Sequence, residues 1–276
     1  MFWLHRLNPA NEFKRHFELV QADSPQLKDE VYRIRHRIYC EELGFERPRF
    51  DGRERDEFDD HSRHLLLRSV KTGVAMGCIR LVLAPPDRPE AQLPFERICG
   101  TVIDRRAFDP TDLRRDRIAE LSRLALAPEF RRRRRGESGT ESGHRSFGTP
   151  AHPGFPYVQL GLYLGATALA EQLGIETIFL LTEPRLLAHF HKLGFPIRQI
   201  AGPVEHRGLR VLSMATVDDP VARLPFFMRP LYRVIALEIA EQRGEDAPAA
   251  DAWPHPRARL TGQIGPGHAG ARPHFG

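Results

Sequence analysis

The chain has 276 residues, of which 41% are apolar and 28% are charged, and its formal net charge is +5. This length can bury a substantial core and accommodates one large domain or two small ones. No apolar stretch reaches the roughly 18 residues of a membrane-spanning helix, and the N-terminal residues lack the features of an export signal. We therefore expect a cytoplasmic protein without a transmembrane segment.

The cysteines and histidines give no sign of a metal site or of a disulfide framework. Cys40, Cys78 and Cys99 form no CxxC pair and leave an odd cysteine over, so we expect them to be reduced, buried residues. The thirteen histidines show no HxxxH or other ligand spacing. We expect no metal.

The first predicted element is an amphipathic helix that begins near residue 24. Asp23 or Ser24 can cap it, and Pro25 suits a first helical turn. Its apolar residues recur at helical spacing: Leu27, Val31, Ile34 and Ile38.

Strands follow. Residues 64–84 predict two strands around a Lys-Thr-Gly turn, and residues 117–128 predict a third. Because side chains alternate along a strand, Glu120 and Arg123 fall on opposite faces unless a bulge intervenes.

The second half alternates helices and strands. The patterns predict helices over 157–174, 183–195 and 226–243, with strands over 175–182 and 211–217. A helix, antiparallel strands and then strand-helix-strand is an α+β order. We expect one domain over residues 10–243, with an Arg-, Gly-, Ser- and Pro-rich insertion over about 131–155 and a disordered tail over 244–276.

An acidic run stands before the first strand. The segment ERDEFDD, residues 54–60, holds five carboxylates in seven residues. By itself such a run is typical of a solvated loop.

The order of elements resembles the GNAT (N-acyltransferase-like) superfamily, through a strand ending in LALAPEF, an arginine run, a helix, a strand and a short helix closing on LGF. The resemblance implies an α+β fold with a central, mostly antiparallel sheet flanked by helices. It also implies a thioester cosubstrate that docks between the two central strands, where unpaired backbone N–H groups can polarise its carbonyl. The insertion enlarges the arginine loop, so a protein-borne pantetheine is expected rather than a compact coenzyme A cradle.

A more specific set of spacings resembles the acyl-homoserine-lactone (autoinducer) synthases. In order along the chain, the pattern consists of a helix with an arginine and two aromatic residues, an E-x-D-x-x-D cluster, a G-x-x-R strand, a phenylalanine and an E-x-x-R strand. The matching residues are Arg35, Tyr39, Phe45, Glu54, Asp56, Asp59, Arg80, Phe95, Glu120 and Arg123. Residues 160–208 look more like N-acyl amino acid synthases and the acyltransferases associated with PEP-CTERM/exosortase systems.

The resemblance assigns roles to these residues. It implies that Asp56 and Asp59 bind a substrate ammonium, and that Arg80 or Arg123 binds its carboxylate. Glu120 is the candidate base, because a partly desolvated carboxylate has a raised pKa. The candidate backbone for polarising the thioester carbonyl is Leu124, Ala125, Leu126 and Ala127.

Each role has a structural alternative. The arginines and acids can form an ion-pair network that ties helix to sheet, and such a network can hold a substrate as well. The aromatic residues Tyr39, Phe45 and Phe95 suit a core as well as a substrate wall.

The arginine run, Arg131, Arg132, Arg133, Arg134 and Arg135, suits docking of the acidic acyl carrier protein. A solvated loop is the alternative, whereas a nucleic-acid patch would need interleaved aromatic residues or a binding module.

The sequence thus predicts an N-acyltransferase that moves a fatty acyl group from acyl carrier protein to an amino acid or similar small amine. The acyl-carrier-protein thioester is its cosubstrate, and no bound cofactor or nucleic-acid partner is expected. One alternative is an acyl-homoserine-lactone synthase using S-adenosylmethionine. Another is a non-catalytic acyl-binding or nucleic-acid-associated module.

Overall fold

The structure is a computed structural model that describes residues 9–85, 87–103, 105–106, 109–128 and 158–245. The expected insertion and the arginine run lie outside the described residues. So does the expected tail from residue 246 onward, since the last helix reaches Glu245. No helix of the described part is long and apolar enough to cross a membrane.

Seven strands form one sheet in the order β1-β2-β3-β4-β5-β7-β6. Neighbouring strands are antiparallel except for β4 and β5, which are parallel. The strands are β1 (Phe17–Gln21), β2 (Ser62–Ser69), β3 (Ala75–Leu83), β4 (Ile118–Leu126), β5 (Thr177–Thr182), β6 (Ile197–Glu205) and β7 (Leu209–Thr216). The expected mostly antiparallel sheet is confirmed.

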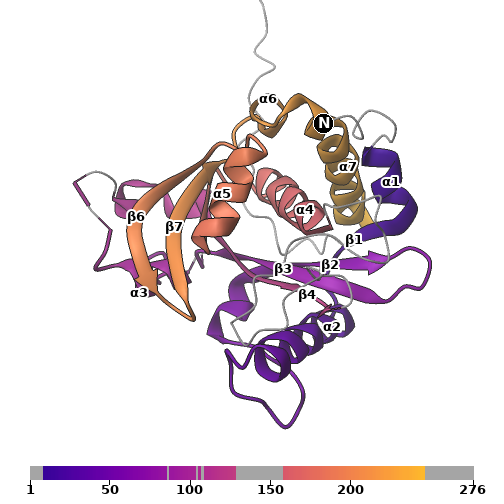
Figure 1. Cartoon of the computed structure of the whole chain (residues 1–276), viewed down its shortest axis with the longest axis horizontal. Helices are drawn as coiled ribbons and strands as arrows, with labels where there is room; N and C mark the ends of the chain where they lie inside the picture. The colour runs from indigo at the N-terminus through magenta and orange to yellow at the C-terminus, as the bar shows by residue number, and fades with distance from the viewer. Residues whose placement is uncertain (1–8, 86, 104, 107–108, 129–157, 246–276) are drawn as a thin grey trace, which may run out of the picture.

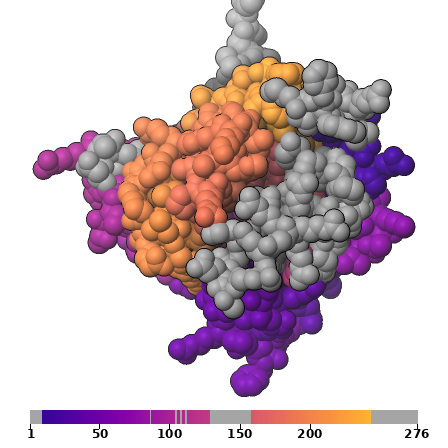
Figure 2. All heavy atoms as spheres, in the orientation of Figure 1, coloured from indigo at the N-terminus to yellow at the C-terminus, as the bar shows by residue number. Residues whose placement is uncertain are grey.

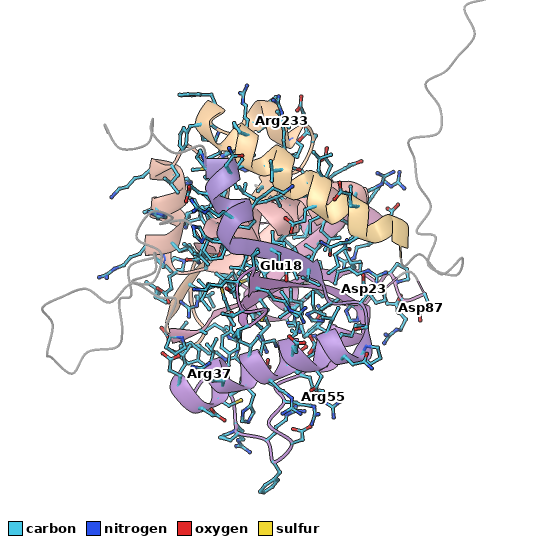
Figure 3. All side chains as sticks on the ribbon, turned by 90° about the vertical axis from the view of Figure 1, so that its right-hand side faces the viewer. Glu18, Asp23, Arg37, Arg55, Asp87 and Arg233 are labelled. Atoms are coloured by element: carbon cyan, nitrogen blue, oxygen red, sulfur yellow. The ribbon has the colours of Figure 1, made fainter. Side chains whose placement is uncertain are left out.

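Helices cover both faces of the sheet (Figure 1). Helices α1, α4 and α7 lie on one face and α2 on the other, with the sheet between them (Figures 1 and 3). The longer helices are α1 (Pro9–His16), α2 (Pro25–Arg35), α4 (Val158–Gln172), α5 (Pro184–Lys192) and α7 (Arg229–Glu245). The short ones are α3 (Pro94–Cys99) and α6 (Pro220–Arg223). Further helical segments are the π-helical η1 (His36–Glu42) and the 3-10 helices η2 (Glu57–His61), η3 (Pro110–Asp112), η4 (Arg115–Arg117) and η6 (Phe226–Met228).

Strands β4 and β5 part after a short parallel ladder. Their pairing runs from Ile118 with Thr177 to Leu121 with Leu180. Strand β4 then continues to Leu126 along β3, while β5 continues along β7 to Thr182. The second half of β4 therefore pairs on one edge, and a gap opens on its other edge.

A β-bulge interrupts the alternation of side chains in β4. Cys78 pairs with Ala125 and Arg80 with Ser122, so two residues of β4 lie opposite one residue of β3. Arg123, one of these two, has a φ of 50°, in the left-handed region. The bulge allows the Arg123 side chain to reach the α2 side of the sheet, which Ser122 also faces.

Most predicted elements are confirmed, and the missed ones are short or irregular. The sequence patterns do not predict α1, β1, α3, α6 or β6. Strand β6 contains Gly202 and Pro203, which are poor strand formers, and it lies at the edge of the sheet where proline is tolerated.

Gly77 allows β3 and β4 to approach closely. A Cβ at this position would lie 2.6 Å from Leu126 Cδ2 and 2.7 Å from the Ala125 carbonyl oxygen. We therefore expect Gly77→Ala to lower the free energy of unfolding by about 1–3 kcal/mol through overpacking, measured by urea denaturation. The matched control is Gly202→Ala, because nothing lies within 4 Å of its Cβ position. Equal effects of the two substitutions would contradict this account.

Candidate active site

The acidic run folds into a turn that directs three of its carboxylates inward. Asp56 caps η2 by accepting a hydrogen bond from the Phe58 N–H at 3.0 Å, and Asp59 accepts one from the Asp56 N–H at 2.8 Å. Glu57 and Asp60 are exposed. A solvated loop is therefore the wrong interpretation for Glu54, Asp56 and Asp59, which face arginines.

Arg35 lies at the buried centre of this arrangement. Its side chain is fully buried at the end of α2 and contacts two carboxylates. Its Nε donates to Glu54 Oε2 at 2.5 Å, and its Nη1 and Nη2 donate to Asp59 at 2.7 and 3.1 Å. This bidentate geometry fixes the position of Asp59 relative to the helix.

Arg80 joins the network from the sheet. Its Nη1 donates to Asp56 Oδ1 at 2.6 Å and to Asp59 Oδ1 at 2.8 Å, and its Nε donates to Ser122 Oγ at 3.1 Å. Asp59 therefore bridges Arg80 on β3 and Arg35 on α2. This part of the network ties helix to sheet, in agreement with the structural alternative.

Arg123 forms the partly exposed rim of the network. Its Nη2 donates to Asp56 Oδ2 at 2.9 Å and to Glu46 Oε1 at 3.1 Å, and its Nε lies 3.3 Å from Glu54 Oε1. The side chain of Arg123 is 16% exposed and that of Asp56 is 19% exposed, whereas Arg35 is completely buried. The rim is partly open to solvent, while the inner pairs are enclosed.

Mutual neutralisation keeps the network ionised. Burial opposes charge on Asp59, but hydrogen bonds and positive charge from Arg35, and the charge of Arg80, hold its pKa well below its usual range. The same balance of burial against arginine charge lowers the pKa values of Glu54 and Asp56. The three carboxylates are therefore charged at neutral pH.

Glu120 lies apart from these ion pairs. It is 3% exposed, and its Oε2 accepts a hydrogen bond from the Phe95 N–H at 2.6 Å. Burial raises its pKa to about 8, against the lowering effects of the Phe95 hydrogen bond and of the charges of Arg80 and Arg123. A carboxyl with this pKa can exchange a proton near neutral pH.

The predicted aromatic residues occupy three different environments. Tyr39, in the π-helical turn η1, donates its hydroxyl to the Leu124 carbonyl at 2.7 Å. Phe95 is fully buried and stacks on Phe179 with ring centroids 4.3 Å apart, so it belongs to the core. Phe45 is 36% exposed.

His64 is a further member of the site that sequence reasoning missed. It is 1% exposed on β2, and its Nε2 lies 3.6 Å from Asp59 Oδ1. Burial lowers its pKa to about 3, and the nearby charges of Arg35 and Arg80 act in the same direction, so the ring is neutral at pH 7.

An apolar pocket lies on the opposite face of the sheet, between the sheet and helices α4, α5 and α6. Leu121 and Leu180, the last pair of the β4–β5 ladder, both line it. Tyr163 of α4 and Phe190 of α5 pack edge to face in its wall, with ring centroids 4.7 Å apart. The pocket therefore begins where the two strands part.

The four candidate backbone residues are not equivalent. The Ala127 N–H donates to the Met76 carbonyl at 2.9 Å, so it cannot polarise a thioester in this structure. Because successive N–H groups of a strand point to opposite edges, that of Leu126 points to the gap beside β5. By the same alternation the Ala125 N–H points toward β3, so the Leu126 N–H is the candidate that remains in the regular part of the strand.

Residues 34–137 match the family described as Acetyltransferase (GNAT) domain. Residues 34–137 therefore carry a domain of the GNAT type. This match confirms the expected fold and the expectation of an acyltransferase. A search of the curated proteins gives no match.

Solved structures share the fold of this chain at low sequence identity. TofI, in a ternary complex with an inhibitor and MTA, is 19% identical over 78% of this chain and 95% of its own, with a TM-score of 0.52. The CoA-dependent acyl-homoserine lactone synthase BjaI, with SAM and isopentyl-CoA, is 20% identical over 82% and 89%, with a TM-score of 0.51. FeeM, an N-acyl amino acid synthase from uncultured soil microbes, is 15% identical over 77% and 97%, with a TM-score of 0.51. At these identities the likeness shows the fold.

The fold brings most of the predicted site residues to one face of the sheet. The residues of the ion network and Glu120 lie on the side of α2 and α3, while the apolar pocket lies on the side of α4. Glu46 was missed because it lies outside the E-x-D-x-x-D spacing. No group of three potential metal ligands exists among the described residues.

Proposed function

We propose that the protein is an N-acyltransferase that moves a fatty acyl group from acyl carrier protein to the amine of an amino acid or a similar small amine. The observation that carries this proposal is the position of Glu120 and Leu121 at the parting of β4 and β5. Glu120 lies on the face of the sheet that also carries the charged network, and Leu121 lines the apolar pocket on the other face. A thioester in the gap would have its acyl chain on one side and the amine on the other.

The reaction then needs one proton acceptor and one polarised carbonyl. The amine nitrogen forms a bond to the thioester carbon, and the carbon–sulfur bond breaks to release the pantetheine thiol. Glu120 accepts the amine proton directly or through water, and the Leu126 N–H supports the negative charge that develops on the carbonyl oxygen. Asp56 at the exposed rim attracts the substrate ammonium, while Arg123 binds its carboxylate.

Synthesis of acyl-homoserine lactones is the second candidate. The residues of the ion network have the spacing of those synthases, and the fold is shared with TofI and BjaI as well as with FeeM. This candidate differs in using S-adenosylmethionine and in closing a lactone after acylation. An association with PEP-CTERM systems stays a prediction.

Mass spectrometry separates the candidates. The protein is incubated with acyl carrier protein carrying fatty acyl groups, in one arm with a mixture of L-amino acids and in another with S-adenosylmethionine. We expect acyl amino acids in the first arm. Acyl lactone in the second arm alone would favour the lactone synthase, and no product in either arm would contradict both.

The donor is tested through the arginine run, which lies outside the described residues. If Arg131–Arg135 dock acyl carrier protein, turnover with that donor falls as salt rises, because screening weakens the attraction of opposite charges. Turnover with acyl coenzyme A serves as the comparison. Equal use of both donors without a salt effect would contradict the docking role.

The apolar pocket predicts control of acyl length. Ala215 of β7 lines the pocket, so we expect Ala215→Phe to shift the products toward shorter acyl chains by filling this space. The measurement is the chain-length distribution of products formed from an equimolar mixture of acyl carrier protein thioesters. Ala201→Phe is the matched control, because Ala201 packs against the cluster on the other face. An unchanged distribution in Ala215→Phe would place the acyl chain elsewhere.

A further inference from the structure

Glu46 connects two arginines that come from distant parts of the chain. Its Oε1 accepts hydrogen bonds from Arg123 Nη2, at 3.1 Å, and from Arg207 Nη2. Arg207 lies in the turn between β6 and β7, 161 residues away in sequence from Glu46. All three side chains are partly exposed, with exposed fractions of 16% for Arg123, 24% for Glu46 and 29% for Arg207.

The turn holds Arg207 in a defined position. Arg207 has a φ of 53°, and its carbonyl accepts a hydrogen bond from Arg210 Nη2 at 2.9 Å. Arg210 is in turn 2.8 Å from Glu183 Oε1, at the start of α5. The strands of this hairpin lie beside α5 on the face shown in Figure 2. The guanidinium of Arg207 is therefore presented by a braced turn.

The carboxylate of Glu46 is placed on a loop that begins and ends at glycines. Gly44 has a φ of 62° and Gly52 a φ of 64°, and nothing lies within 4 Å of either Cβ position. Such positions can absorb a change of backbone direction without a collision. The loop can thus carry the Glu46 side chain away from the two arginines.

The charges around Glu46 favour a bound anion. The network contains four arginines, Arg35, Arg80, Arg123 and Arg207, and four acids, Glu46, Glu54, Asp56 and Asp59. Moving the Glu46 carboxylate away leaves the network with one positive charge in excess. The two arginines that lose this partner, Arg123 and Arg207, are those at the exposed rim. An incoming carboxylate would restore the balance.

We propose that Arg207 and Arg123 together bind the carboxylate of the acyl acceptor, and that Glu46 occupies this position in the empty enzyme. This inference rests on the proposed N-acyltransferase function and specifies its acceptor as an amine with a free carboxylate. Glu46 competes with the acceptor for the two arginines. A carboxylate that replaces Glu46 restores the ion pairs, whereas a simple amine or an amino acid amide leaves the two arginines without a negative partner. Arg207 thereby determines specificity.

The alternative is that Glu46 and Arg207 form only a structural link between the hairpin and the loop. The two accounts predict different directions of change in the preference for acceptors with a free carboxylate. If the link is structural, Glu46→Gln and Arg207→Gln break the same contact and change selectivity in the same direction or not at all. If Glu46 competes with the substrate, removing its charge improves the binding of carboxylates, and removing the charge of Arg207 weakens it.

The test is a competition between L-amino acids and the corresponding L-amino acid amides, supplied as an equimolar mixture with acyl carrier protein thioester. We expect Arg207→Gln to lower the ratio of acyl amino acid to acyl amide by about tenfold, the effect of losing one charge-assisted hydrogen bond. Glu46→Gln should raise the ratio. Arg198→Gln on β6, whose Nη2 lies against Met214 Sδ, is the matched control and should leave it unchanged. Shifts of the same sign in the first two variants, or none, would overturn the proposal.

Binding without an acyl donor separates this site from the reaction. Saturation-transfer NMR with the same mixture should show the wild-type protein binding the acids more strongly than the amides, and Arg207→Gln losing that preference. A second arm compares S-adenosylmethionine with its decarboxylated form and identifies which amino carboxylate is preferred. Acid-selective binding without any acyl transfer would refute the proposed function and leave the carboxylate site standing. Wild-type protein without a preference for the acid in either arm would refute the carboxylate site.

Discussion

Glu120→Gln is expected to reduce kcat/KM for acyl transfer by about 100-fold or more, the range found when a general base is removed. Glutamine keeps the size of the side chain, and its amide oxygen can still accept the hydrogen bond from the Phe95 N–H. The expected loss therefore follows from the missing proton acceptor. Activity at the wild-type level in this variant would exclude Glu120 as the base.

The pH profile gives an independent test of the same role. Burial raises the pKa of Glu120 to about 8, so the carboxyl is mostly protonated at pH 7 and becomes a base as the pH rises through 8. We expect kcat/KM of the wild-type protein to rise with pH and to level off above that value. The residual activity of Glu120→Gln should lack this step.

The raised pKa also has a consequence for stability. Between the ordinary value of 4.5 and about 8, the folded protein keeps a proton on Glu120 that the unfolded chain has lost, so its contribution to stability falls as pH rises through this window. Glu120→Gln should remove that part of the pH dependence. Glu238→Gln is a matched control, because Glu238 accepts a hydrogen bond from the Leu19 N–H and also has a raised pKa, far from the gap between β4 and β5. The Glu238→Gln variant should retain full acyltransferase activity.

Arg35→Leu is expected to lower the free energy of unfolding by about 3–5 kcal/mol, because it leaves buried carboxylates without their partner. Glu54 and Asp59, which Arg35 contacts, have side chains only 5% and 3% exposed. The measurement is urea denaturation at pH 7.

Arg33→Leu is the matched control for this prediction. Arg33 lies on the same helix, but its side chain is 58% exposed and pairs with Asp29 one turn away. Exposed pairs of this kind contribute about 0.2–1 kcal/mol. Equal losses in the two variants would mean that the buried network does not stabilise the fold.

The network also predicts how acid affects stability. Arginine charge lowers the pKa values of Glu54, Asp56 and Asp59 in the folded protein, so their contribution is present above the unfolded values and is lost as the pH falls below about 4. Arg35→Leu should reduce the steepness of this loss. The comparison is the urea midpoint of each variant between pH 5 and pH 3.

The candidate site was predictable to the extent that it depends on spacing along the chain. Glu54, Asp56 and Asp59 have the spacing of a turn that directs them to one side, whereas Glu57 and Asp60 remain exposed. Composition alone would assign all five to solvent. The difference arises because Arg35 and Arg80 supply buried positive charge, and charge is stable inside a protein only when paired.

Other features of the candidate site have no signal in the local sequence. Strict alternation along a strand places Arg123 on the face opposite Glu120, but a bulge and the positive φ of Arg123 direct the side chain to the α2 side. Glu46 and Arg207 are ordinary charged residues in loops, and only the folding of the β6–β7 hairpin brings them together.

The sequence by itself determined the α+β order of elements, most strand and helix positions, and six residues of the charged network, Arg35, Glu54, Asp56, Asp59, Arg80 and Arg123. Hydrophobic periodicity, turn residues and spacing predict these features because they act over short distances along the chain. The tertiary structure alone decided which of those charges are enclosed and which form an exposed rim. It also placed Leu121 at an apolar pocket and Glu120 on the opposite face, at the parting of β4 and β5. Burial and pairing between distant residues depend on the packing of the whole chain, and short-range patterns do not contain that information.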